Sequence, residues 1–309
     1  MKVRFWGVRG SLASPLVARQ IQSKISAVVQ RITAKDIESA DTRERFISEL
    51  PAWIFGTVGG NTPCVEVRGN DETEIILDAG TGIYGLGKSK NLPKNKNFNV
   101  FLSHFHWDHI QGLPFFDPIF DSEAKIHVYS ALASAETLLR AQQTMPYFPA
   151  EMGDNVTFKT KSSGDTFSLG DFVVSLCKMT HPGESHSFSF SENGRKLVYA
   201  TDVELNRQDF EETAEHISVF KDADCIILDS QYTVNESHKK VNWGHSSFCY
   251  AVDFAARWNI KNLYLFHHEP SYDDKKLNSL EKSARWYAKN IVHSDVNIFL
   301  AKEGLEFEL

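Results

Sequence analysis

The sequence HFHWDH, residues 104–109, decides how this chain is interpreted. It places three histidines and one aspartate within six residues, directly after the apolar run Val100–Leu102. Imidazole nitrogens and carboxylate oxygens are the donors that zinc and neighbouring transition metals prefer. In an extended backbone positions 104 and 106 project to the same side, whereas a helical turn near Trp107 directs Asp108 and His109 to a second point. The hexapeptide therefore predicts a cluster that can hold two metal ions.

Further metal donors follow other apolar runs of the chain. A lone histidine or aspartate at the end of a strand is usually a hydrogen-bonded structural residue, so each of these is weak evidence by itself. Loops at strand ends, however, gather on a rigid scaffold to build active sites. Together with HFHWDH the set predicts one composite site. Its members are His181 after the run 172–179, Asp202 after 197–200 and His267 after 263–266.

The order of the predicted elements indicates the fold class. Short β-type runs alternate with helical stretches, and the strands form two groups that are each followed by helices. This order favours two packed sheets with helices outside, in a single α/β domain over residues 1–309. Apolar residues at helical spacing, such as Ile21, Ile25 and Ile32, predict a helical insert at about 11–55.

Composition and charge limit the classes of function. The net charge of −7 gives the surface as a whole no attraction for nucleic acid or an anionic membrane, although a local basic patch remains open. The N-terminus lacks a signal-peptide core, and no apolar run approaches a membrane span. We therefore expect a soluble, cytoplasmic protein. Its four cysteines form no CxxC pair and are expected to be buried free thiols: Cys64, Cys177, Cys225 and Cys249.

The order of these motifs along the chain resembles that of the metallo-β-lactamase superfamily. The resemblance covers nearly the whole chain apart from the insert. It implies an αββα four-layer sandwich with two mixed β-sheets and outer helices, and two divalent metal ions at one edge. Zinc is the expected metal, with manganese or iron as alternatives. The implied roles are His104, His106 and His181 for the first metal, Asp108, His109 and His267 for the second, Asp202 bridging both, and Asp78 orienting the site from behind the ligands.

Five further stretches narrow the resemblance to the branch that contains ribonuclease Z-like and cyclic-nucleotide phosphodiesterase-like hydrolases. They are FWGVRGS at 5–11, GGNTPCVEV at 59–67, LDAGTGI at 77–83, HWDHIQGLPFF at 106–116 and LFHHEP at 265–270. In that branch a further histidine precedes a helix shortly before the last ligand. His245, 22 residues before His267, takes this place and is the best sign of phosphoester chemistry. The alternative is a helix-entry histidine with Ser246 as the cap.

These residues predict a dinuclear metal-dependent hydrolase, a phosphodiesterase that acts on a small phosphodiester, with cyclic nucleotides among the candidates. The metals would activate water for attack on phosphorus. Asp108 and His245 are the predicted catalytic residues, with protonated His245 donating to a phosphoryl oxygen or to the leaving alkoxide. The expected partner is this small substrate rather than a membrane, and a homodimer is left open.

The sequence leaves three alternative functions open. A metallo-hydrolase for a thioester, sulfate ester or lactone fits the ligands equally well, and only His245 argues against it. A ribonuclease Z-like nuclease is disfavoured, because the chain lacks a basic, glycine-rich arm and its net charge is acidic. Nucleic acid is thus an unexpected partner, although not an excluded one. A non-enzymatic metal-binding sensor is disfavoured, because no expected ligand is missing.

Two local patterns have competing interpretations. Residues 80–85 spell GxGxxG, but no acidic residue follows near twenty positions on, so a glycine turn beside Asp78 is favoured over a dinucleotide site. The apolar stretch 113–120 fits a pocket wall, a dimer interface or core packing. Finally, strand alternation places His267 and His268 on opposite sides, and position relative to Pro270 selects His267 as the ligand.

Overall fold

The computed structural model describes residues 1–309, whose strands divide between two seven-stranded mixed sheets. The first sheet has the order β14 (Glu306–Glu308), β1 (Lys2–Gly7), β2 (Cys64–Arg68), β3 (Glu74–Leu77), β4 (Asn97–Phe101), β5 (Lys125–Ser130) and β6 (Val156–Thr160). The second has the order β13 (Asn297–Leu300), β12 (Asn262–Phe266), β11 (Cys225–Asp229), β10 (Arg195–Ala200), β9 (His186–Glu192), β8 (Phe172–Lys178) and β7 (Thr166–Leu169).

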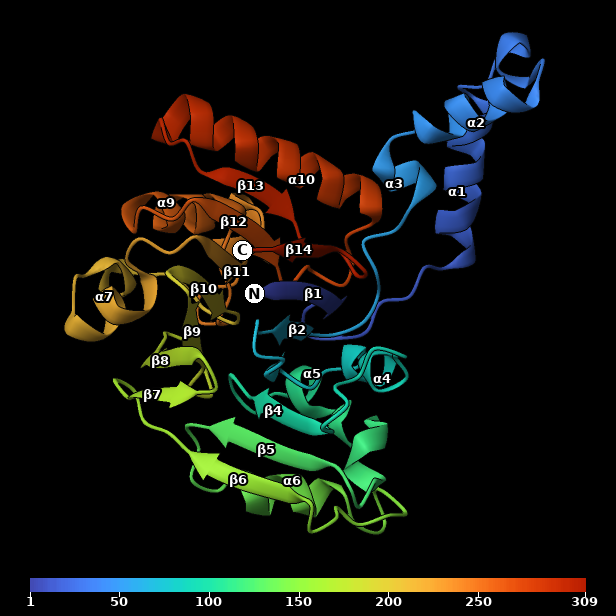
Figure 1. Cartoon of the computed structure of the whole chain (residues 1–309). Coiled ribbons are helices and arrows are strands. Elements are labelled where there is room, and N and C mark those ends of the chain that lie inside the picture. The colour runs from blue at the N-terminus through green and yellow to red at the C-terminus, as the bar shows by residue number, and fades with distance from the viewer.

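Each sheet joins a parallel half to an antiparallel half. The strands β3 to β6 run parallel, as do β10 to β13, while the remaining neighbours pair antiparallel. Parallel neighbours require crossover connections, which place helices on the outer faces. The main outer helices are α4 (Gly82–Gly87), α6 (Ala135–Gln142), α7 (Ala214–Phe220), α9 (Phe248–Arg257) and α10 (Asp274–Tyr287). The predicted αββα sandwich is therefore confirmed (Figure 1).

The burial of β3 shows how the layers are held together. Ile75 and Leu77 belong to the large core of 49 buried residues, which also contains residues of the second sheet such as Phe188 and Phe190. Ile76, between them, belongs to a smaller core of 18 buried residues that includes Leu86 of α4. Successive strand residues point to opposite faces, so one continuous apolar run serves both the inter-sheet core and the helix layer.

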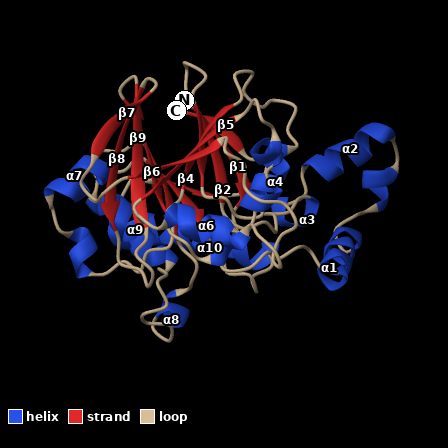
Figure 2. Cartoon of the chain, turned by 90° about the horizontal axis from the view of Figure 1, so that it is seen from below, coloured by secondary structure: helices blue, strands red, loops and turns tan.

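Several short helices complete the chain outside the sheets. They are α1 (Ala18–Val29), η1 (Ala34–Ile37), α2 (Ala40–Ser48), α3 (Ala52–Phe55), α5 (Trp107–Ile110), η2 (Leu113–Phe115), η3 (Asp117–Phe120), η4 (Arg207–Phe210), α8 (Val234–Ser237) and η5 (Ala288–Val292). The segment from α1 to α3 connects β1 to β2 and extends away from the sandwich in both views (Figures 1 and 2).

Two expectations from composition can be compared with the fold. All four cysteines are free thiols, and Cys64, Cys177 and Cys225 are buried as expected, whereas Cys249 is only half-buried. None of the helices combines the length and the apolar content that a bilayer span requires.

Candidate metal centre

The candidate centre lies where strands of both sheets end. Asp78 follows β3, and His104 follows β4, its parallel neighbour in the first sheet. Asp202 and His267 follow β10 and β12, which flank β11 in the parallel half of the second sheet. Because parallel strands end at the same edge of a sheet, topology alone gathers these side chains, which are far apart in the sequence.

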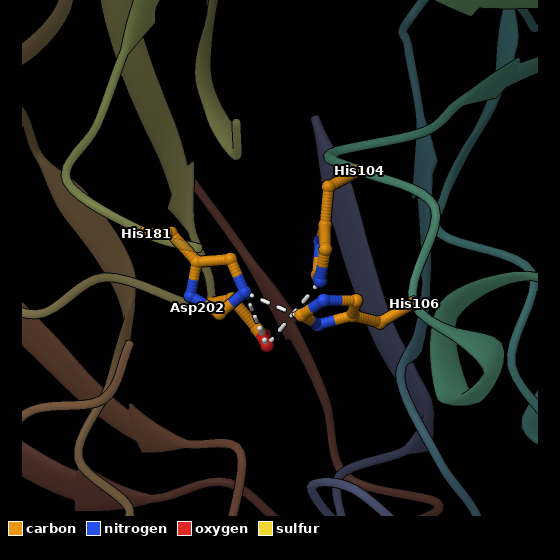
Figure 3. A group of neighbouring side chains, drawn as sticks. All are labelled: His104, His106, His181 and Asp202. Carbon is orange, nitrogen blue, oxygen red and sulfur yellow. Dashed lines mark hydrogen bonds and ion pairs between the residues drawn. The ribbon is translucent and has the colours of Figure 1, made fainter. Parts of the chain in front are cut away.

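One group of donors combines His104, His106, His181 and Asp202 (Figure 3). One ligand atom of each lies within 4.8 Å of the others. The Nε2 atom of His181 lies 3.2 Å from Nδ1 of His106, and the Asp202 Oδ2 atom lies 3.6 Å from Nε2 of His104. Three imidazoles and one carboxylate oxygen thus converge on one point.

A second group combines Asp108, His109 and His267. The Asp108 Oδ2 atom lies 3.2 Å from the Nε2 atoms of both His109 and His267. The Oδ1 atom of Asp202 lies 3.1 Å from His109 Nε2 and 3.0 Å from His267 Nε2. Asp202 therefore turns one oxygen to each group, which is the arrangement needed to bridge two cations.

Hydrogen bonds at Nδ1 orient these imidazoles. Asp78 Oδ2 lies 2.7 Å from Nδ1 of His109, and the Gly244 carbonyl accepts from Nδ1 of His181 at 2.9 Å. The Oε1 atom of Gln231 lies 3.1 Å from Nδ1 of His267. Each bond fixes a ring so that Nε2 points into its donor group, a common arrangement around metal-binding histidines.

The Asp78 carboxylate is itself fixed from the rear. It is fully buried and accepts hydrogen bonds from the hydroxyl of Tyr199 at 2.8 Å and from the backbone and hydroxyl of Ser103. Burial lowers the pKa of His109, but the surrounding carboxylates of Asp202, Asp108 and Asp78 outweigh burial and hold that pKa well above its usual range. The electrostatic potential at the second donor group is therefore strongly negative, and it attracts cations.

The donor set fits divalent cations. The Nε2 atom of His104 is buried and has no hydrogen-bond partner, a costly condition unless a cation satisfies it. Burial holds the pKa of His104 well below its usual range, so its ring is neutral and keeps a lone pair for coordination. Five imidazoles and two carboxylates that converge on two points match the chemistry of a two-metal site.

Backbone strain accompanies three of these residues. Asp78, Asp202 and His267 have φ values of 59°, 50° and 58°, in the left-handed region that favours glycine. Such a conformation costs about 1–3 kcal/mol for a residue other than glycine and persists only where the surroundings impose it. Each follows a buried strand, and the turn directs its side chain into the centre.

His268 behaves differently from its neighbour His267. Its Nε2 atom lies 2.9 Å from the Ala301 carbonyl, away from both donor groups. Burial and the nearby Arg9 guanidinium lower the pKa of His268 to about 3, so the ring is neutral and donates to that carbonyl. The two histidines do diverge as expected, but the cause is the left-handed turn at His267 rather than strand alternation.

His245 lies beside the donor groups with a carboxylate of its own. Its Nδ1 atom lies 2.7 Å from Asp229 Oδ2, and its ring stacks on His267 with 4.8 Å between centroids. Burial lowers the pKa of His245, but the Asp229 and Asp202 carboxylates outweigh burial and raise it to about 9. The hydrogen bond to Asp229 uses Nδ1, which leaves the N–H at Nε2 available to a substrate.

Comparison with known proteins identifies the family. A family model described as "Beta-lactamase superfamily domain" matches residues 73–268. The chain is a member of this superfamily. It is similar to the ribonuclease Z of Picrophilus torridus, with 21% identity over 81% of this chain and 91% of the relative. The resemblance to the ribonuclease Z-like branch is thereby confirmed, and the chain is a metal-dependent hydrolase.

Solved structures of the superfamily share the fold. The metallo-beta-lactamase fold protein YhfI from Bacillus subtilis superposes with a TM-score of 0.67 and 16% identity, covering 100% of this chain and 98% of the other. The short form of human tRNase Z superposes with a TM-score of 0.64 and 19% identity, covering 100% and 99%. At these identities the likeness establishes the architecture alone.

The candidate centre of this chain also includes residues that the sequence patterns did not reveal. Asp229 ends β11 as the other acidic residues end their strands, so the same signal could have found it. The backbone N–H of Ser11 donates to Asp108 Oδ2 at 2.7 Å, and no side-chain pattern reports such a bond. Only Gly80 and Thr81 of the GxGxxG segment form the turn beside Asp78, and helix α4 begins at Gly82. A Cβ on Gly80 would collide with the Asp108 carbonyl.

The stretch 113–120 is divided between core and surface. Leu113, Phe116 and Ile119 are buried in the smaller core, whereas Phe115 and Phe120 are exposed. Core packing therefore accounts for three of the five large apolar side chains in this stretch, and none of the five belongs to the donor groups.

Proposed function

We propose that this member of the superfamily hydrolyses a phosphodiester. The observation that carries the proposal is the pair formed by His245 and Asp229 beside the two donor groups. The metal ligands alone are enough to activate water in a hydrolase of this superfamily. A histidine that is held by its own carboxylate therefore adds a further catalytic group. Such a proton donor suits phosphodiester hydrolysis, because charge develops on the phosphoryl oxygens and on a poorly activated leaving alkoxide.

Two divalent cations, with zinc as the expected metal, complete the proposed site. His104, His106 and His181 would hold one, Asp108, His109 and His267 the other, and Asp202 would contact both. Bound there, the cations supply Lewis acidity that makes water nucleophilic at neutral pH. The unpartnered Nε2 atom of His104 supports this assignment.

The chain's own groups then divide the remaining work. Water attacks phosphorus, the phosphorus–oxygen ester bond breaks, and His245 gives its Nε2 proton to the leaving alkoxide or a hydrogen bond to a phosphoryl oxygen. Asp229 accepts from Nδ1–H and thereby fixes both the ring and the tautomer. The Asp108 carboxylate, held by the Ser11 N–H, is proposed to orient the attacking water as well as to bind metal.

A small phosphodiester is the proposed substrate class. The relatives named ribonuclease Z support phosphodiester chemistry in this branch. The net charge of −7 does not favour a long polyanion, because nucleic-acid affinity depends on neutralising many phosphates. A nuclease activity is therefore an outcome to test rather than the proposal.

The test is a substrate panel with the metal-loaded protein. Bis(p-nitrophenyl) phosphate and cyclic nucleotides should turn over, while a matched thioester, sulfate ester and lactone should not. His245→Ala should impair the phosphodiester reactions and keep its metal. Turnover of a thioester or lactone without any phosphodiester turnover would reject the proposal and leave the superfamily assignment intact.

A further inference from the structure

The helices between β1 and β2 form a cleft against the start of α10. Helix α3 lies between α1 and α10 and contacts both (Figure 1). The cleft has two adjoining chambers of about 290 and 540 Å³, whose linings share Arg19, Ser23, Trp53 and Lys275. Together they match the size of small-molecule sites, which is about 300–1,000 Å³. None of the lining residues belongs to the metal donor groups, so this cleft is separate from the candidate metal centre.

One face of α1 supplies polar side chains to the cleft. Arg19, Ser23, Ser26 and Gln30 line it and recur every three or four residues, which is the spacing of one helix face. On the other side of the helix Ile25 is exposed. This orientation reverses the usual one, in which a surface helix turns its apolar residues to the core. The helix thus presents guanidinium, hydroxyl and amide donors to the cleft instead of packing into it.

A buried ion pair fixes the walls of the cleft. Lys24 Nζ lies 2.6 Å from Asp274 Oδ2 and donates to the carbonyls of Trp53 and Gly56 at 2.7 and 2.6 Å. The Asp274 carboxylate is buried and also accepts from the Val58 N–H at 2.9 Å. These bonds join α1, α3 and α10 at one point, so the cleft is organised before a ligand binds. They also cancel the charge of Lys24.

The other basic residues of the cleft have no acidic partner. Arg19, Arg31 and Lys275 are exposed, and none of them forms an ion pair with a carboxylate of the chain. The remaining acidic residue of the lining, Asp273, accepts from the Lys276 N–H at 2.7 Å as the cap of α10. Four basic and two acidic side chains therefore line the cleft, a net charge of +2 in a chain whose net charge is −7.

The sequence around α1 has the same bias. Residues 11–35 contain four basic residues and no acidic one, although the whole chain has 40 acidic and 33 basic residues. Like charges that line one concave surface repel each other, and the walls focus their positive potential into the cleft. The local basic patch that composition left open therefore lies here, where it attracts anions.

Trp53 holds two of the cations beside its ring. The ring centroid lies 5.7 Å from Cζ of Arg31 and 5.6 Å from Nζ of Lys275. An indole attracts a cation through its quadrupole and carries no negative charge of its own. Trp53 therefore positions both cations without cancelling their charge, which stays available to a bound anion.

We propose that this cleft binds a small anion with two or more linked phosphate groups, such as the polyphosphate chain of a nucleotide. A guanidinium binds phosphate through two parallel hydrogen bonds, and an ammonium binds it as a point charge. A phosphate group also accepts more hydrogen bonds than a carboxylate, which suits the hydroxyl and amide donors of α1. Three unpaired cations spread over two chambers match a ligand whose charges are spaced along a chain.

Calorimetric titration of the metal-loaded, full-length protein with tripolyphosphate tests the proposal. One equivalent should bind, and Arg19→Glu/Lys275→Glu should raise the dissociation constant by about tenfold or more. Lys282→Glu/Lys289→Glu is the matched control. It makes the same change in net charge at exposed positions outside the cleft and should change the dissociation constant by less than about twofold. Metal content is measured after each titration, so that extraction of zinc is not mistaken for binding.

A protection experiment on the unmodified chain makes the test independent of variant folding. Tripolyphosphate should protect Lys275 from acetylation by acetic anhydride and leave Lys282 reactive, as measured by mass spectrometry. Tighter binding of ATP than of tripolyphosphate would identify a nucleotide as the ligand, and equal binding an inorganic polyphosphate. No binding up to about 1 mM would overturn the proposal. So would equal weakening in both double variants, tighter binding of citrate, or binding of single-stranded RNA without binding of tripolyphosphate.

Discussion

The metal centre and the helical segment 11–55, which we call the arm, are organised in opposite ways. In the centre, donor side chains such as His109 and Asp202 are buried, and hydrogen bonds from buried neighbours fix their rings and carboxylates. In the arm, only Ala27 and Ile54 are buried. Its largest row of apolar side chains faces solvent and consists of Val17, Ile21, Ile25 and Val29. The ligand set of the centre is complete within one chain, whereas the arm leaves most of its apolar surface exposed.

The two regions should therefore respond differently to substitution. A change in the centre alters charge in a buried network, where an unpaired group is expensive. A change on the arm alters a solvent-exposed face, where substitutions cost little within one chain.

Asp202→Ala should have the largest effect, because Asp202 alone turns an oxygen to each donor group. We expect loss of most bound metal and a fall in kcat/KM on the order of a thousandfold or more, since Lewis-acid stabilisation is worth several kcal/mol. Elemental analysis and kinetics on the same preparation check this. Retention of both metals would show that Asp202 is no bridge.

His267→Ala should remove the second metal and most of the activity, because His267 Nε2 faces Asp108 and Asp202. His268→Ala is the adjacent comparison and should keep its metal, although the lost bond to Ala301 should lower thermal stability. Metal content and melting temperature, measured on both variants, separate the two roles. The reverse pattern of metal loss would mean that the ligand register is wrong.

His245→Ala should lower kcat by about a hundredfold to ten-thousandfold and leave metal content unchanged, as expected for a residue that serves only the transition state. The defect should shrink with a p-nitrophenolate leaving group if His245 is the leaving-group acid. Asp229→Asn, which keeps the shape but weakens the hold on Nδ1, should give a smaller defect in the same direction. Full activity in His245→Ala would contradict the phosphodiesterase proposal.

Ile25→Asp should have the smallest effect. Because Ile25 is exposed on the arm, metal content and kcat should change by less than about twofold. The contrast with Asp202→Ala makes the comparison of the two regions quantitative. A large catalytic loss in Ile25→Asp would show that the arm takes part in the reaction of its own chain or of a partner.

Much of the centre could be predicted because each donor follows an apolar run that must become a buried strand. His181, Asp202 and His267 all carry this local signal, and the parallel pairing of β10, β11 and β12 then brings Asp202 and His267 to the same edge of the sheet. Asp229 carries the same signal, but no ligand set required it. The role of Asp229 becomes visible only in the structure, where it pairs with His245, 16 residues away in the sequence.

Other parts of the molecule could not be predicted from local pattern. The bond from the Ser11 N–H to Asp108 joins positions 97 residues apart and involves no side chain of Ser11. The periodicity of residues 21–32 predicted a helix with an apolar face, but periodicity does not say what that face contacts. A tertiary ion pair, Lys24 with Asp274, decides that the face of α1 points outward.

Metal stoichiometry tests the central claim most directly. The protein should be purified without chelators, equilibrated with zinc, freed of unbound metal and analysed for metal per chain. Two donor groups that share Asp202 predict two equivalents in the unmodified chain and one in His267→Ala. A single equivalent in the unmodified chain, unchanged by adding more zinc, manganese or iron, would contradict the dinuclear centre.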